Sequence, residues 1–266
     1  MSNSTKPLAG LRSDLRDGVL HIAIDNQARL NAFTAAMWNE LPMLIRAAEA
    51  NDSVRVIVLK GAGEKAFSAG ADISEFESNR TAASASAYDH SNNVAFETLA
   101  KSSKPTIAMV NGFCLGGGLE VALCCDLRVA SSVSQFSVPA AKLGIGYNPR
   151  WMRPMLGVVS AARAKELLFT GRRFSASEAA GMGLVNQVVQ PHELEAKTTA
   201  LAAEIAGNAP LSILAAKRCV DAIAENPGIS DLAHLDALVD ACFASADYVE
   251  GRRAFMEKRK PTFRGK

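Results

Sequence analysis

A glycine-rich turn followed by an apolar helix is the segment of this sequence best suited to chemistry. Residues 111–126 read NGFCLGGGLEVALCCD, with Gly116, Gly117 and Gly118 in the turn before the apolar run. Such a turn exposes backbone N–H groups at the start of a helix, where the helix dipole favours negative charge. The pattern therefore indicates a site that could stabilise an oxyanion.

Glu120 lies in the first turn of that expected helix, within the otherwise apolar run 119–123. Burial disfavours the charged form of a carboxyl group, so it would raise the pKa of Glu120 toward the range that suits acid–base catalysis. The structural alternative is a buried glutamate paired with an arginine, next to glycines that only allow close helix packing. The residues alone favour neither interpretation.

A second segment, 65–73 with the sequence KAFSAGADI, consists mainly of small residues and follows a β-branched stretch. Its small side chains would let a ligand approach the backbone, so it could provide a second amide donor. Just upstream, Gly61, Gly63 and Ala66 fit a loose G-x-G-x-x-A dinucleotide pattern. No periodic helix and no suitably placed acidic residue follow, which argues against a nicotinamide cofactor.

Strands and helices alternate in the part of the chain that surrounds these segments. Thr34 is expected to cap a helix over 35–50, in which Pro42 predicts a kink or break near Leu41. Residues 81–87 are small and polar, which predicts a loop or a frayed helix start. The alternation predicts an α/β core. Strands are expected at 19–24, 54–59, 106–110, 127–130 and 185–189.

From Pro191 onward the pattern is helical to about Lys260, with breaks at Pro210 and at 226–228. No strand is expected in this part. We therefore divide the chain into a core, residues 1–200, and a helical C-terminal region, residues 201–266.

Composition sets the class of protein and excludes several partners. The chain has 266 residues, of which 48% are hydrophobic and 21% charged, so it can bury a large core. A net charge of +2 argues against a polyanionic partner, and the basic residues near the C-terminus lack the aromatic interleaving of nucleic-acid binders. The five cysteines have no paired spacing, which argues against a metal site and predicts a reducing compartment. The N-terminus has no apolar stretch, so we expect a cytoplasmic protein without membrane contact.

Taken together, the two small-residue segments resemble the signature stretches of the enoyl-CoA hydratase/isomerase (crotonase) family. The resemblance implies a spiral of ββα units with a helical C-terminal trimerisation region, assembled as a trimer or a dimer of trimers. It also implies an acyl-CoA thioester as substrate, with coenzyme A entering only as part of that substrate and no separate cofactor. Further similar stretches are residues 29–32, 104–108, 125–130, 170–173, 183–186 and 255–259.

The resemblance implies roles for individual residues. The N–H groups of Ala71 and Gly117 would hold the thioester oxygen, and Glu120 would exchange protons. Arg29, Lys65 and Lys258 are candidate phosphate contacts, with Phe255 from a neighbouring subunit. The remaining substrate-binding candidates are Asn31, Ala32, Ser68, Ala69, Gly70, Asp72, Ile73, Gly116, Ala140 and Tyr147.

Two departures from the hydratase pattern stand close together. Ala140 occupies the position where hydratases carry a second glutamate, and residues 146–152, GYNPRWM, replace a glycine-rich turn. Tyr147, Asn148, Arg150 or Trp151 could line the acyl pocket, although an aromatic residue there could also serve packing alone. We expect a hydratase or dehydratase that works through an enolate. The alternatives are an isomerase or other enolate chemistry, and a paralogue that only binds acyl-CoA.

Overall fold

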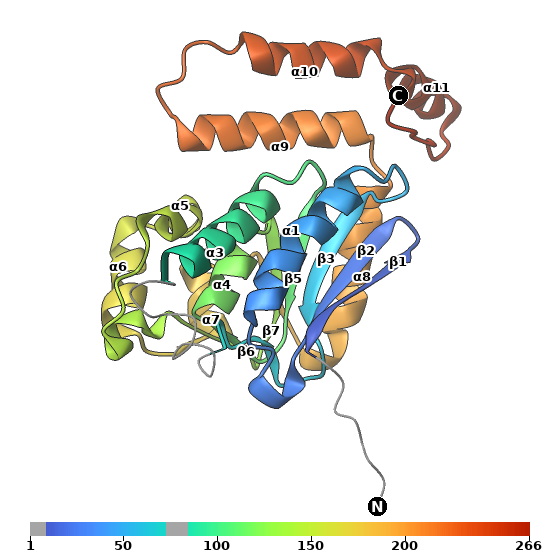
Figure 1. Cartoon of the computed structure of the whole chain (residues 1–266). Coiled ribbons are helices and arrows are strands. Elements are labelled where there is room, and N and C mark those ends of the chain that lie inside the picture. Colours follow the sequence, from blue (N-terminus) through green and yellow to red (C-terminus); the bar gives the residue numbers. More distant parts are fainter. Residues whose placement is uncertain (1–8, 73–84) are drawn as a thin grey trace, which may run out of the picture.

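Two β-sheets form the centre of the computed structural model, which describes residues 9–72 and 85–266 (Figure 1). In the large sheet, β1 and β2 form an antiparallel hairpin and the other neighbours are parallel. Its strands, in spatial order, are β1 (Gly10–Arg16), β2 (Val19–Asp25), β3 (Val56–Gly61), β5 (Thr106–Val110), β7 (Leu127–Ser131) and β10 (Gln187–Val189). The small sheet consists of β4 (Ala66–Ser68), β6 (Phe113–Leu115), β8 (Gln135–Ser137) and β9 (Phe174–Ser175).

The chain winds as a repeated ββα spiral, which confirms the expected α/β fold. Each turn adds one strand to the large sheet and one short strand to the small sheet before a helix follows. Consecutive turns are β3, β4 and α3 (Ala85–Ala100), then β5, β6 and α4 (Gly117–Leu123), then β7 and β8. Parallel strands joined in this way place the ends of β4 and β6 side by side.

Helices cover both faces of the large sheet, which is why its central strands β3, β5 and β7 are mainly apolar and buried on both sides. In Figure 1, α1 (Ala35–Glu49), α3 and α4 lie in front of the sheet and α8 (Leu194–Ala206) lies behind it. The larger core lies on the side of α1 and α3, where it includes Phe33, Trp38 and Phe96. A smaller core lies under α8.

The helix α1 begins where the sequence predicted, with the Thr34 side chain accepting a hydrogen bond from the Met37 N–H. Of the kink or break predicted near Leu41, the break is wrong, because α1 continues through Pro42 to Glu49. Proline inside a helix costs about 3 kcal/mol. Leu41 and Ile45, on either side of Pro42, are fully buried, and burial of each contributes about 1.5–3 kcal/mol, which offsets that loss.

Short helices and loops connect β8 to the helical C-terminal part. Residues 81–84, where a loop or frayed helix was expected, lie outside the described residues, and α3 begins at Ala85. The connecting elements are η3 (Pro139–Leu143), α5 (Pro149–Val158), α6 (Ala161–Thr170), α7 (Ala176–Gly181) and η4 (Pro191–Glu193).

Three helices form a separate layer above the core: α9 (Pro210–Glu225), α10 (Ala233–Ala244) and α11 (Ala246–Glu257) (Figure 1). Lys217 on α9 ties this layer to the core, because its ammonium group lies 2.8 Å from the Asp126 carboxylate. The expected division near residue 200 falls inside α8, which packs on the large sheet.

Among residues 9–72 and 85–266, no single helix is both long and apolar enough to cross a membrane. The segments Pro191–Ala206 and Pro210–Glu225 meet the length and composition requirements only as a pair, and that pair is bent by 104°.

Candidate active site

The N–H groups of Ala71 and Gly117 lie close together where β4 and β6 end. A methyl group placed on Gly117 would lie 3.8 Å from the Ala71 nitrogen, and one placed on Gly70 would lie 3.0 Å from the Gly117 nitrogen. Within the described residues, neither N–H donates a hydrogen bond. Two unused donors at the ends of neighbouring strands form a site that can bind one oxygen atom from both sides.

The segment before Ala71 is held by hydrogen bonds that leave its amide unused. The Phe33 N–H donates to the Gly70 carbonyl at 2.7 Å, and the Asp72 N–H donates to the Phe33 carbonyl at 2.9 Å. Gly70 has a φ of +96°, a conformation that residues with a side chain rarely adopt, and its N–H donates to the Ser68 hydroxyl. These contacts fix the direction of the Ala71 N–H.

Glu120 is buried one turn into α4, with 1% of its surface exposed. The Tyr147 hydroxyl donates a hydrogen bond of 2.8 Å to Oε2 of Glu120, whereas Oε1 has no partner among the described residues. Burial raises the pKa of Glu120 to about 8, and the hydrogen bond from Tyr147 partly opposes that rise. Glu120 can therefore both accept and release a proton near neutral pH.

The alternative of a glutamate paired with an arginine does not apply to Glu120. Arg128 is the buried arginine nearby in the sequence, and its guanidinium donates to the carbonyl groups of Ala122, Cys125 and Leu184. No ion pair with Glu120 occurs in the described part of the chain.

A chain of aromatic rings connects the amide site to Glu120. The edge of Trp38 lies 3.4 Å from a methyl group built on Gly117, and Trp38 packs edge to face against Phe96. Phe96 contacts Trp151, and Trp151 contacts Tyr147, in both cases edge to face. These rings form an apolar wall that runs from the amide site to the carboxyl group.

Comparisons with known proteins show the family to which the chain belongs. A family model described as "Enoyl-CoA hydratase/isomerase" matches residues 14–266. The chain belongs to the enoyl-CoA hydratase/isomerase family. It is 36% identical to a short-chain-enoyl-CoA hydratase from Clostridium acetobutylicum over 90% of this chain and 91% of that protein. It is also 36% identical to a crotonyl-CoA hydratase from Syntrophomonas wolfei, over 90% of this chain and 92% of that protein.

A solved structure gives the same result for the fold. The crystal structure of an enoyl-CoA hydratase/carnithine racemase from Magnetospirillum magneticum superposes with a TM-score of 0.91 at 34% identity. The match covers 96% of each chain. The spiral fold expected for an enoyl-CoA hydratase/isomerase family member is thereby confirmed.

Several residues expected to bind substrate surround the paired amides. Ser68, Ala69, Gly70 and Asp72 form the segment that presents the Ala71 N–H, and Gly116 directly precedes Gly117. Ile73 lies outside the described residues.

Asn31 and Ala32 are buried beside this segment rather than open to it. The Asn31 side-chain amide donates to the carbonyl groups of Ala62 and Ala66, at 2.9 and 2.7 Å, so both of its hydrogens are used. This arrangement holds the strand β4 that leads to Ala71.

The candidate phosphate contacts lie on the surface, on two separate parts of the chain. Arg29 ends η1 (Gln27–Arg29) and Lys65 directly precedes β4, and both are exposed. Phe255 is 82% exposed on α11, and Lys258 follows the same helix. In Figure 1, α11 lies in the C-terminal layer, away from α4.

The position expected for a second carboxylate is occupied by the partly buried methyl group of Ala140 in η3. The Asn148 side chain caps α5 by accepting from the Arg150 N–H. Arg150 itself is exposed. Of the residues 146–152 that replace the glycine-rich turn, Tyr147 is the one whose polar group reaches Glu120.

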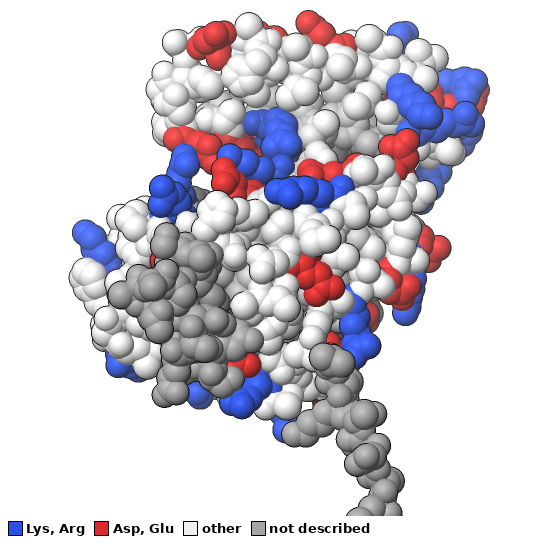
Figure 2. Space-filling view, viewed as in Figure 1, with Lys and Arg blue, Asp and Glu red and all other residues white. Residues whose placement is uncertain are grey.

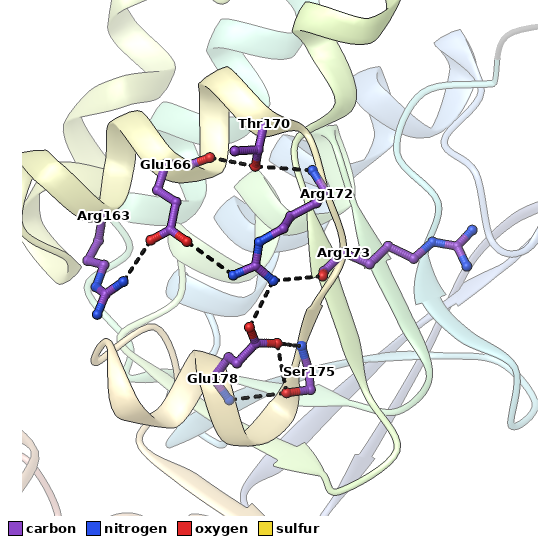
Figure 3. Close-up of polar contacts among 7 residues, drawn as sticks. All are labelled: Arg163, Glu166, Thr170, Arg172, Arg173, Ser175 and Glu178. Carbon is purple, nitrogen blue, oxygen red and sulfur yellow. Dashed lines mark hydrogen bonds and ion pairs between the residues drawn. The ribbon is translucent and has the colours of Figure 1, made fainter.

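An ion-pair network around Arg172 joins α6 to α7 (Figure 3). Arg172 contacts the carboxylates of Glu166 on α6 and Glu178 on α7. The hydrogen bond from the Ser175 N–H, followed by that from Arg172, lowers the pKa of Glu178 to about 2. The Ser137 hydroxyl, just before η3, donates to the Gly171 carbonyl. The side chains of the network hold α6 and α7 together, and among the described residues none of them is hydrogen-bonded to Glu120.

No group of three or more histidine, cysteine, aspartate or glutamate side chains in residues 9–72 and 85–266 is arranged to hold a metal ion. The three thiols near the site, Cys114, Cys124 and Cys125, are buried, and burial raises the pKa of each. A thiol with a raised pKa stays protonated and is a poor metal ligand and nucleophile.

Proposed function

We propose that this protein adds water reversibly across the α,β double bond of a short-chain enoyl-CoA thioester. The observation that carries the proposal is the pair of unused N–H groups, Ala71 and Gly117, beside a buried carboxyl group, Glu120, that titrates near pH 8. A thioester oxygen bound by both amides becomes negatively charged as water attacks the β-carbon. One such donor typically contributes about 3–4 kcal/mol to the stability of that charge.

Glu120 would transfer the proton in this reaction. Oε1 takes a proton from water while the water oxygen bonds to the β-carbon, and the double-bond electrons move onto the thioester oxygen. The same carboxyl group then delivers the proton to the α-carbon as the enolate collapses to the thioester. The substrate class is supported by the relatives from Clostridium acetobutylicum and Syntrophomonas wolfei, which are named a short-chain-enoyl-CoA hydratase and a crotonyl-CoA hydratase.

A second candidate is the isomerisation of an enoyl-CoA by moving one proton between two carbons. The observation that favours it is Ala140, because this alanine stands where a second glutamate is expected to share proton transfer with Glu120. Proton transfer from the α- to the γ-carbon needs one group that accepts and then releases a proton, and Glu120 meets this requirement. No oriented water is needed for that reaction.

A panel of acyl-CoA thioesters analysed by mass spectrometry tests these alternatives. A gain or loss of one water molecule indicates a hydratase or dehydratase, and a new isomer of equal mass indicates an isomerase. Binding without any product would show a paralogue that only binds acyl-CoA and would contradict the proposal. We expect the CoA thioester to bind and the free acid not to bind, since the nucleotide and pantetheine provide most of the contacts. Equal affinity for both would contradict the CoA assignment.

We also propose that the protein assembles as a trimer, or a dimer of trimers, through its C-terminal helices. A hollow of about 750 Å³ lies among α9, α10 and α11, lined largely by apolar side chains. Large apolar side chains on these helices are exposed, namely Val220, Ile223, Val239, Phe243, Val249, Phe255 and Met256. Such a surface is typical of a contact with another protein chain. Light scattering at micromolar concentration tests this, and a monomer would contradict it.

Coenzyme A would enter only as part of the substrate, and its phosphates would meet basic side chains from two subunits. Basic side chains gather near α11 at one end of the C-terminal layer (Figure 2). Arg253 and Arg259 there are paired with Glu250, and Lys258 is exposed. In a trimer, Phe255 and Lys258 of one subunit would reach the Arg29 and Lys65 side of its neighbour. We propose the cytoplasm as the place of action, since all five cysteines are free thiols.

A further inference from the structure

The hydrogen bond between Tyr147 and Glu120 uses one carboxyl oxygen and leaves the other free. Oε2 accepts from the Tyr147 hydroxyl at 2.8 Å, and Oε1 is buried without a partner among the described residues. A buried carboxyl oxygen without a hydrogen bond is costly, and in a folded protein such an atom often marks a place where a ligand or water binds. The two oxygens of Glu120 therefore differ in what they can do.

The loop before α5 positions Tyr147 beside the Glu120 carboxyl group. The Gly144 and Ile145 N–H groups both donate to the Ala140 carbonyl, and Gly144 adopts a left-handed φ of +66°. This turn reverses the chain after η3. Tyr147, seven residues beyond Ala140, consequently supplies a polar group to a site where Ala140 supplies none.

The aromatic ring of Tyr147 is fixed by its neighbours. Trp151 packs edge to face on it, with ring centres 5.6 Å apart. The Trp151 indole N–H donates to the Asn93 side chain on α3 at 2.7 Å, which sets the orientation of Trp151. The hydroxyl is therefore held toward Glu120 before any substrate binds.

We propose that Tyr147 is a positioning residue for Glu120: its hydroxyl holds Oε2 of Glu120, so that Oε1 is the atom that exchanges a proton with the substrate or with water. The inference rests on the proposed function of Glu120 as the proton-transfer group. Tyr147 keeps its own proton throughout, and no O–H bond of the phenol breaks.

The charges around this pair agree with that role. Burial and the negative charge of Glu120 hold the pKa of Tyr147 well above its usual range, so the phenol remains a donor. Cys124 is the other titratable group close to Glu120 in the described residues, and its raised thiol pKa keeps it neutral. Among the described residues, burial raises the pKa of Glu120 and the hydrogen bond from Tyr147 lowers it.

The test is Tyr147→Phe, which removes the hydroxyl and keeps the ring that packs on Trp151. We expect kcat to fall on the order of tenfold to a hundredfold, because the reacting oxygen is no longer held in place. KM should change little. The pKa of Glu120, followed by the carbon-13 signal of its carboxyl group and assigned by its loss in Glu120→Gln, should rise above the wild-type value. An unchanged pKa would overturn the proposal.

A double variant shows whether Tyr147 acts through Glu120. In the Glu120→Gln background, adding Tyr147→Phe should lower kcat by less than about twofold, since the proton-transfer group is already absent. A loss as large as in the wild-type background would mean that Tyr147 acts by another route, and the proposal would be wrong.

A fluorotyrosine variant and the carboxyl titration, which is independent of activity, keep the test decisive. If Tyr147→Phe does not fold, fluorotyrosine at position 147 provides a stronger donor of nearly the same shape. The pKa of Glu120 should then fall, and a constant pKa would overturn the proposal. The carboxyl titration needs no turnover, so a protein that converts no acyl-CoA would refute the proposed function while the role of Tyr147 is still judged from the pKa.

Discussion

Trp38 packs directly beside Gly117, with two carbon atoms of its indole ring 3.4 Å from the place where a methyl group on Gly117 would stand. The same methyl group would lie 3.8 Å from the Ala71 nitrogen. The space between the two amides is therefore bounded by an aromatic edge, and it remains open because residue 117 has no side chain.

Gly117→Ala should place a methyl group in this space and block the thioester oxygen. We expect kcat/KM for crotonyl-CoA to fall by about a hundredfold to a thousandfold, as for the loss of one oxyanion donor. Stability should change little, because Gly117 lies in α4 without a left-handed φ. Gly181→Ala is the matched control, since a methyl group there meets no atom within 4 Å. Equal loss in both variants would contradict the assignment of the amide site.

The pKa of Glu120 predicts how stability depends on pH. Its value of about 8 in the folded protein exceeds its ordinary value of 4.5, so the folded state binds a proton that the unfolded state releases. This contribution to stability is fully present below pH 4.5 and is lost as the pH rises through 8. The total loss is about 5 kcal/mol.

Glu120→Gln should remove this dependence, because glutamine does not titrate. The variant should match the wild type near pH 4 and become more stable than it toward pH 9. Urea unfolding at fixed protein concentration across this range measures the difference. Parallel curves for the two proteins would show that Glu120 titrates normally in the folded state.

Ala140→Glu should restore a second carboxyl group to the site and raise the rate of hydration. The absence of a positioned acid or base typically costs a hundredfold or more, so we expect a gain on the order of tenfold or more with crotonyl-CoA. Ala141→Glu, at an exposed position of the same short helix, is the control.

Circular dichroism should first confirm that Ala140→Glu is folded, since a buried unpaired carboxylate is destabilising. A well-folded variant with no gain in hydration would mean that the natural protein already has a full replacement for the second glutamate. The description of the site as a one-carboxylate variant would then fail.

Five of the six strands of the large sheet could be predicted from the sequence, whereas β1 and the small sheet could not. The expected strand at 106–110 matches β5, and the strand at 19–24 matches β2 to within one residue, because apolar runs buried on both faces are visible in the sequence. The strands β4, β6 and β8 have only three residues each, too few for any periodicity. Two of them, β4 and β6, nevertheless lead directly to Ala71 and Gly117.

The residues of the site, like the strands, could be predicted from the sequence only in part. Glu120 and the two amide segments stand out because glycine-rich turns have a recognisable composition. The contact between Tyr147 and Glu120 joins residues 27 positions apart, and it depends on the left-handed turn at Gly144. Trp38 and Phe96, which form the apolar wall, carry no signal beyond that of ordinary core residues, since aromatic residues at helical spacing usually serve packing.

The most direct test of the account is the hydration of crotonyl-CoA by the wild type and by Glu120→Gln, followed by the loss of the enoyl absorbance. The substitution keeps the shape of the side chain and removes the group that carries the proton. The wild type should form the hydrated thioester, and the variant should be slower by about a hundredfold to ten-thousandfold while its affinity for the thioester is nearly unchanged. Equal rates in the two proteins would contradict the account, because Glu120 would then have no part in the reaction.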